Sequence, residues 1–258
     1  MGMETVTSKD GTSIAYERTG QGPALVLVGG AFMTRQSFGP LAEALAGEFE
    51  AVSYDRRGRV DSTDTLPYSV ERELEDLTAV LEAVGGSFVY GMSSGAALAL
   101  LAAGSGVPVR RVAGMEPPYR VEGAPPVDPT YGPVLESLLA EGRRGDAVAH
   151  FVTKAVGQPA EVVDQMKASP MWDGLVAVAP TLAYDNAIMG DGEPPALLAN
   201  IAVPALIISS TGSSPWLQAG AAGAAAALPD ARHVQRDGGF HDLPVEVLAA
   251  VLTEFFKA

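Results

Sequence analysis

Ser93 lies in a segment whose residue types and spacing could present a nucleophilic hydroxyl, Gly91-Met92-Ser93-Ser94-Gly95. The segment directly follows the apolar run 88–90 and directly precedes the small apolar run 96–101, so a strand, a sharp turn and a helix should meet at Ser93. Glycine is needed on both sides because such a turn brings the strand and helix too close for side chains. The helix N-terminus also favours negative charge beside the serine. We therefore expect Ser93 to be a nucleophile, the alternative being a serine that only caps the helix.

A serine hydroxyl needs a base, and the chain has three histidines that could serve. His150 lies on a helical pattern, where a packing or surface role is expected, and His233 lies in the strand-like run 232–235, where a structural role is more common. His241 lies in a glycine-containing loop, 238–242, and loops at strand ends often present catalytic groups. We expect His241 to be the base, with an exposed loop histidine as the alternative.

The elements that must position these residues alternate between strands and helices. Residues 4–18 predict a β-hairpin around Asp10-Gly11, because this pair tolerates the positive φ angles of a two-residue turn. Further strands are expected at 24–28, 51–54, 87–90, 109–115, 205–209 and 232–235, and helices around 38–45, at 69–84, from 94, up to 228 and at 244–256. This order predicts an α/β fold, a mostly parallel sheet covered by helices on both faces.

Residues 119–200 interrupt this alternation. They show helical patterns at 133–141, 145–156 and 159–167 without a convincing strand between them, and prolines stand at both ends of the segment. We expect a helical cap at 119–200 inserted into a core made of residues 1–118 and 201–258. The alternative is that the segment is simply more of the core.

The composition excludes several classes of function. Seventeen basic residues against thirty-one acidic ones give a net charge of −14, which disfavours binding to nucleic acid or to an anionic membrane. The absence of cysteine excludes disulfides, thiolate metal sites and a cysteine nucleophile. No targeting segment, membrane-spanning run or cluster with metal-ligand spacing is recognisable, so we expect a cytoplasmic protein without a metal or cofactor.

Over its whole length the sequence resembles the α/β-hydrolase superfamily, and in two places a bacterial subgroup of it, mostly unassigned in function. The superfamily resemblance lies in the hairpin and in segments 28–32, 54–58, 91–95 and 239–242; the subgroup resemblance lies in Met115-Glu116-Pro117-Pro118-Tyr119 and in 212–216. The resemblance implies an α/β-hydrolase fold and, by position, an oxyanion hole made by the backbone N–H groups of Ala31 and Ser94. Gly29 and Val60 depart from the family pattern without removing a backbone donor.

The resemblance also implies a carboxylate that orients His241, and here the chain departs from the commonest pattern. The superfamily usually has an aspartate after the strand predicted at 205–209, but no Asp or Glu occurs between Ile208 and Pro229. Some members carry the acid one strand earlier, where this chain has Glu116, and the chain order of nucleophile, acid and base is then kept. We expect Glu116 to be the acid; the alternative is a loop carboxylate held between prolines. Asp237 and Asp242 are nearer His241 in sequence, but neighbours rarely point at a ring nitrogen.

These residues predict a serine hydrolase that cleaves an ester, thioester or lactone through an acyl-enzyme. We expect Phe32, Met92, Trp172 and Met171 to line the substrate pocket, and large apolar groups of the cap, Phe151, Met166, Tyr184 and Met189, to serve the same pocket or form the cap's own core. The expected partner is a small, largely apolar substrate, and a homodimer is possible. The alternative function is a non-hydrolytic member of the fold, a lyase, cyclase or ligand-binding protein that uses the same pocket.

Overall fold

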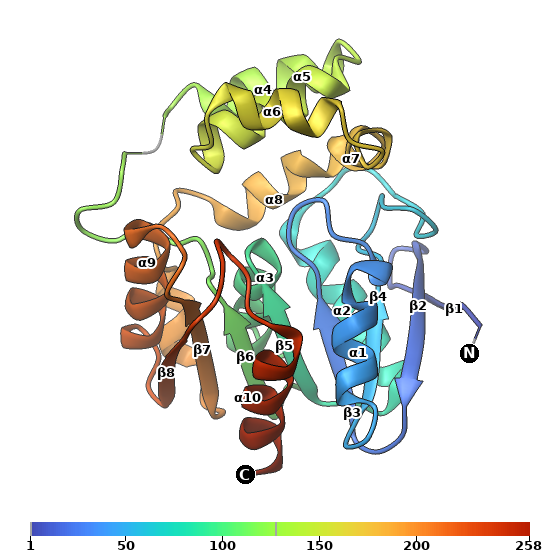
Figure 1. Ribbon diagram of the computed structural model, residues 1–258. Helices are drawn as coiled ribbons and strands as arrows, with labels where there is room; N and C mark the ends of the chain where they lie inside the picture. The colour runs from blue at the N-terminus through green and yellow to red at the C-terminus, as the bar shows by residue number, and fades with distance from the viewer. Residues whose placement is uncertain (1, 127) are drawn as a thin grey trace.

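An eight-stranded sheet forms the centre of the protein (Figure 1). The structure is a computed structural model that describes residues 2–126 and 128–258. The strand order is β1-β2-β4-β3-β5-β6-β7-β8. The strands are β1 (Glu4–Thr7), β2 (Ser13–Gly20), β3 (Ala24–Val28), β4 (Glu50–Tyr54), β5 (Phe88–Met92), β6 (Arg111–Met115), β7 (Ala205–Ser210) and β8 (Ala231–Arg236). All pairs from β4 to β8 are parallel and only β2 pairs antiparallel, with β1 and β4, which confirms the predicted mostly parallel α/β sheet.

The first two strands form the predicted hairpin, but its loop is longer than the predicted two-residue turn. The Ser8 N–H donates to the Thr12 carbonyl at 2.8 Å, which leaves three residues, 9–11, in the loop. Of the Asp10-Gly11 pair only Gly11 takes a positive φ, of 90°. Asp10 instead accepts a hydrogen bond from the Thr12 N–H at 3.0 Å, so its side chain stabilises the loop by bonding to the loop's own backbone.

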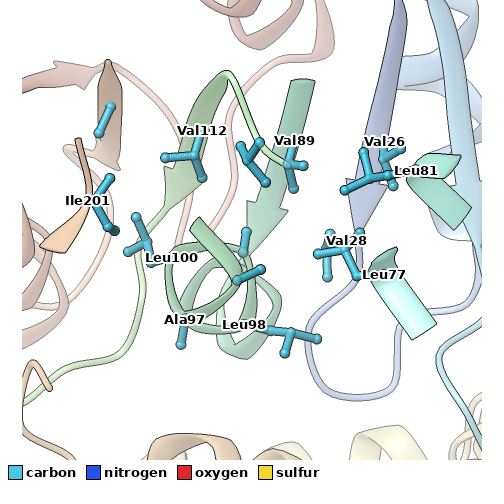
Figure 2. Close-up of a cluster of buried hydrophobic side chains, with 14 of the residues drawn as sticks. Val26, Val28, Leu77, Leu81, Val89, Ala97, Leu98, Leu100, Val112 and Ile201 are labelled. Carbon is cyan, nitrogen blue, oxygen red and sulfur yellow. The ribbon is translucent and has the colours of Figure 1, made fainter. Parts of the chain in front are cut away.

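Helices cover both faces of the sheet, because consecutive apolar residues of its central strands point to opposite faces and both faces must be shielded from water. Along β3, Leu25 and Leu27 point to one face and Val26 and Val28 to the other, and all four are fully buried. The first face is covered by α1 (Gly39–Leu45) and α10 (Val245–Lys257), and the second by α2 (Val70–Val84), α3 (Ser94–Gly104) and α9 (Pro215–Ala226). Figure 2 shows the second face, where Val26 and Val28 lie against Leu77 and Leu81 of α2.

The segment between β6 and β7 is helical and lies over one end of the sheet (Figure 1). It contains α4 (Tyr131–Ala140), α5 (Arg144–His150), a π-helical turn (Phe151–Ala155), α6 (Ala160–Lys167), α7 (Trp172–Val178), α8 (Leu182–Met189) and 3-10 turns at Ala179–Thr181 and Ala196–Asn200. Helices occur at the three predicted places, whereas α7 and α8 were not predicted.

The packing of this segment has two parts. Residues of α4 to α7 share an apolar cluster with Leu182, the first residue of α8, and this cluster includes Leu135 and Val148. In contrast, Ile188 of α8 and Leu198 pack in the same cluster as the sheet. The division of the chain into a core and a cap at 119–200 therefore stays a prediction. Among the described residues no helix is long and apolar enough to cross a membrane.

Candidate active site

Ser93 lies at the turn between β5 and α3, in a backbone conformation that is rare for a residue with a side chain. Its φ and ψ are 58° and −128°. A Cβ on Gly91 would lie 2.2 Å from the Gly95 carbonyl oxygen, and one on Gly95 would lie 2.3 Å from the Val28 carbonyl oxygen. Gly91 is therefore required by the close approach of β5 and α3 at the turn, as predicted, whereas Gly95 is required by the approach of α3 to the end of the neighbouring strand β3. The turn leaves the Ser93 side chain facing a cavity at the carboxyl end of β5.

Glu116 and His241 are in direct polar contact at the site. His241 Nδ1 lies 2.6 Å from Glu116 Oε2, so the predicted contact between these two residues is present. The Glu116 side chain is fully buried, and that of His241 is 21% exposed. Both residues also have positive φ angles, of 45° and 53°. A strained backbone at three residues from separate loops that face one another is typical of a functional site.

The loop after β7 lacks a carboxylate, but it holds the carboxylate that comes from β6. Glu116 directly follows β6, and its N–H donates to the Ile208 carbonyl at 2.9 Å, which extends the pairing with β7. Glu116 Oε1 accepts from the Ser210 N–H at 2.8 Å, and Oε2 accepts from the Ser213 hydroxyl at 2.9 Å. The Ser213 oxygen in turn accepts the His241 N–H at 2.9 Å. Burial alone would raise the pKa of Glu116, but its hydrogen bonds to His241, Ser210 and Ser213 hold it below the ordinary value, so the carboxyl stays ionised.

The other candidate bases and acids are occupied elsewhere. His150 stacks on Tyr131 and its Nε2 lies 3.1 Å from the Tyr131 carbonyl. His233 Nε2 lies 3.0 Å from Ser209 Oγ on the neighbouring strand. Asp237 accepts from the Thr211 hydroxyl at 3.2 Å. Neither histidine lines the cavity that Ser93 faces.

Ser93 and His241 line one cavity of about 290 Å³. Within the described part of the chain, no hydrogen bond joins the Ser93 hydroxyl to the His241 ring. Such contacts are often longer before a substrate is bound and tighten in the complex. The arrangement thus places the Ser93 hydroxyl and the His241 imidazole at one cavity, with the ionised Glu116 carboxylate bonded to the imidazole from behind.

The two residues predicted to form an oxyanion hole border the same cavity. Ala31 follows β3 by three residues, and Ser94 is the first residue of α3, so the helix offers its N–H no carbonyl partner. A Cβ on Gly30 would lie only 2.8 Å from Ser93 Cβ, so glycine lets this loop approach the serine closely. Two backbone donors on either side of Ser93 are suited to hold a negative oxygen.

The expectations for the apolar wall hold in part. Met92 lines the cavity, and so do Phe151 and Met189. Phe32 lies behind this wall, with its ring edge-on to that of Phe151 at 5.2 Å. The prediction for Met171 and Trp172 is wrong, because α7 lies against α5 and not over the site. Met171 is 70% exposed, and Trp172 packs closely on Gly145.

Asp185, which was not predicted as a site residue, is a buried carboxylate of α8 that also borders the cavity. Its Oδ1 accepts from the Ser94 hydroxyl at 2.7 Å and from Arg56 Nη1 at 2.6 Å, and its Oδ2 accepts from Arg59 Nη2 at 2.9 Å. Burial alone would raise the pKa of Asp185, but the charges of Arg56 and Arg59 lower it. The one available signal was a single carboxylate in the mostly apolar run 182–189.

The two arginines connect Asp185 to the loop after β3. Arg59 Nη1 donates to the Gly30 carbonyl at 2.6 Å and to the Met33 carbonyl at 3.0 Å. Arg56 also pairs with Glu73 of α2 through two contacts of 2.6 and 2.7 Å. Ala31 lies between the two carbonyls that Arg59 holds, and Ser94 is held by Asp185 itself. One buried network therefore positions both predicted oxyanion donors. Among the described residues, no group of His, Asp and Glu is placed to hold a metal ion.

Comparison with known proteins places this geometry in a family. The sequence pattern of the Alpha/beta hydrolase family matches residues 25–251. An alpha/beta hydrolase from Sphaerobacter thermophilus DSM 20745 is 52% identical and superposes with a TM-score of 0.94, over 98% of this chain and 100% of that one. The esterase RhEst1 from Rhodococcus sp. ECU1013 shares the fold at 22% identity, with a TM-score of 0.72 over 100% of this chain and 99% of that one.

A curated relative matches a shorter stretch. The uncharacterized hydrolase YraK of Bacillus subtilis (strain 168) is 34% identical over 95 residues, which is 35% of this chain and 35% of that protein. The match thus spans about a third of the relative's length. Because the family pattern covers most of the chain and a structure 52% identical covers nearly all of it, this chain belongs to the alpha/beta hydrolase family.

Proposed function

We propose that the chain is a serine hydrolase that cleaves an ester, thioester or lactone of a small, largely apolar substrate through an acyl-enzyme. The observation that carries this proposal is the 2.6 Å contact between His241 Nδ1 and the ionised Glu116, on the wall of the cavity that Ser93 faces. An imidazole whose Nδ1 proton is bound by a carboxylate has Nε2 free to accept a proton. The strained turn at Ser93 and the two backbone donors beside it support the same chemistry.

The proposed reaction begins with attack of Ser93 Oγ on the substrate carbonyl carbon. His241 takes the hydroxyl proton at Nε2, and the carbonyl oxygen becomes negative and is held by the N–H groups of Ala31 and Ser94. When the tetrahedral intermediate collapses, the bond to the leaving alcohol or thiol breaks and His241 returns the proton to it. Water then repeats the steps on the acyl-enzyme and releases the acid. Glu116 stays ionised throughout and stabilises the positive charge that His241 carries transiently.

A fluorophosphonate probe tests the proposed nucleophile directly. The probe should label the wild-type chain at Ser93, and Ser93→Ala should abolish labelling and turnover of simple acyl esters. Ser105→Ala, at the opposite end of α3, is the matched control and should be labelled normally. Labelling that persists in Ser93→Ala would exclude Ser93 as the nucleophile. Labelling of Ser93 without turnover of any ester, thioester or lactone would instead favour the non-hydrolytic alternative.

A further inference from the structure

Two cations line the cavity without forming an ion pair with any described carboxylate. The acidic, basic and histidine side chains that line it are Arg120, Asp128, Lys154, Asp185 and His241. The charge of Asp185 is already matched by two arginines, and His241 is paired with Glu116. Asp128 is exposed and accepts hydrogen bonds from the N–H and hydroxyl of Thr130 at 2.9 and 2.7 Å. Within the described residues, neither Arg120 nor Lys154 has a carboxylate oxygen within 4 Å.

Arg120 is the better placed of the two cations. Arg120 is half-buried in the segment after β6 that starts with Glu116. Its backbone N–H donates to the Gly192 carbonyl at 2.7 Å. Its guanidinium lies over the Trp216 ring, 5.3 Å from the centroid, and Nη1 donates to the Pro125 carbonyl. Stacking on an indole restrains the guanidinium plane and leaves further N–H groups on its edge.

The surroundings of Arg120 favour an anionic ligand. Burial lowers its pKa. Glu122, Asp191 and Glu193 line a second hollow with Arg120, but within the described residues none of them pairs with its guanidinium within 4 Å. A guanidinium remains protonated in proteins, so the desolvated charge stays in place and lacks an ionic partner. A bound carboxylate would supply one through two parallel N–H···O bonds. Lys154 is exposed at the same cavity and adds a second, more screened positive charge.

We propose that the substrate carries a carboxylate in addition to its scissile ester, thioester or lactone group, and that Arg120 binds this carboxylate. The inference rests on the proposed function and specifies its substrate class. The rest of the wall is largely apolar, with Met92, Phe151, Met189, Leu217 and Phe240. A short hydrocarbon chain between the carboxylate and the scissile carbonyl fits this lining. A cavity of about 290 Å³ suits such a small molecule.

Matched esters provide the test. Ethyl monoesters of malonate, succinate, glutarate and adipate carry a free carboxylate, and each is compared with its neutral monoamide, which has nearly the same shape. The wild-type chain should hydrolyse the ester bond of at least one acid monoester with a kcat/KM roughly ten- to hundredfold above that of the matched ester in which the free acid is an amide. The reason is that the hydrogen-bonded charge pair with Arg120 cannot form in the amide compound. Arg120→Gln should abolish most of this preference, and Arg120→Lys should keep part of it.

Two further variants separate a local effect from a general one. Lys154→Gln should reduce the preference only slightly, by about twofold, because its charge is exposed. Arg110→Gln removes an exposed arginine at the opposite end of β6 and should leave the preference intact. If the wild-type chain hydrolyses both esters of every pair equally, the inference about a carboxylate is overturned and the proposed hydrolase function stands. An Arg120→Gln chain that loses activity on both to the same extent would overturn the inference in the same way. If no ester is hydrolysed and fluorophosphonate does not label Ser93, the proposed function fails and the inference with it.

Discussion

Two buried carboxylates lie at the candidate active site: Asp185 lines the cavity, and Glu116 bonds to His241, which lines it. The two carboxylates differ in the groups that neutralise their charge. Both have pKa values below the ordinary value despite burial. Glu116 is held by an N–H group, a hydroxyl and the His241 ring, and the ring is its only partner that can become positively charged. Asp185 is bound by two arginines that are permanently charged.

This difference separates a reactive carboxylate from a structural one. The charge of Glu116 has an ionic partner only when His241 is protonated, which in the proposed reaction happens transiently. The charge of Asp185 is matched at all times, so it changes little during a reaction, and its main effect is to connect α8 with Ser94 and the loop after β3. Replacing either carboxylate by its amide should therefore damage different properties of the protein.

Glu116→Gln should cause the larger loss of activity. The amide cannot hold His241 in the required tautomer, and kcat should fall by roughly 10³- to 10⁴-fold, while fluorophosphonate labelling becomes slow rather than absent. Steady-state kinetics with a simple acyl ester measure this effect. Asp242→Asn is the control, because Asp242 is adjacent to His241 in sequence without bonding to its ring; its kcat should stay within about twofold. Comparable losses in both variants would contradict the role of Glu116.

Asp185→Asn should cause the larger loss of stability. It leaves Arg56 and Arg59 buried with only Glu73 as a carboxylate partner, and the free energy of unfolding should fall by about 3–5 kcal/mol. Because the oxyanion donors shift with it, kcat should fall by about 10²-fold at most. Urea unfolding and kinetics measure the two effects. Asp173→Asn on α7, an exposed acid, is the control and should change stability by less than about 0.5 kcal/mol. An Asp185→Asn chain as stable as the control would show that the network is not a structural support.

The stability contributed by Asp185 should depend on pH with a defined sign. Its pKa in the folded protein is lower than in the unfolded chain, where it is about 3.9. Its contribution is therefore complete above about pH 5 and is lost as the pH falls below about 4 towards the folded pKa. The difference in unfolding free energy between wild type and Asp185→Asn should be constant from pH 7 to 5 and shrink in more acidic solution. A difference that grows as the pH falls would contradict the lowered pKa.

Ser94→Ala should have the smallest effect. It removes the hydroxyl bond to Asp185 at 2.7 Å but keeps the backbone N–H that is proposed to hold the oxyanion. Stability should fall by about 1 kcal/mol and kcat by less than about tenfold. Thermal unfolding and kinetics on one preparation measure both. A loss as large as that of Glu116→Gln would mean that the hydroxyl itself takes part in the reaction.

The sequence was informative wherever function depends on a short segment. Gly91 to Gly95 predicted the turn at Ser93, because the steric conflict that requires Gly91 arises within these five residues. The conflict that requires Gly95 involves Val28 and Gly29 at the end of β3, which no local pattern specifies. The contact of Glu116 with His241 was predicted from chain order and from the missing carboxylate after β7. The hairpin loop was predicted less well, because Asp10 bonds to its own loop and leaves only Gly11 with a positive φ.

The sequence by itself determined the mostly parallel α/β sheet, the turn at Ser93 and the loop position of His241, since each follows from local periodicity or local sterics. Only the tertiary structure decided which side chains of the helical segment reach the cavity, because that depends on how α7 and α8 pack. Met171 points to solvent and Trp172 packs on α5, whereas Asp185 is buried against Ser94. Arg56 and Arg59 lie more than a hundred residues from Asp185 along the chain, and no local pattern specifies a charge network across that separation.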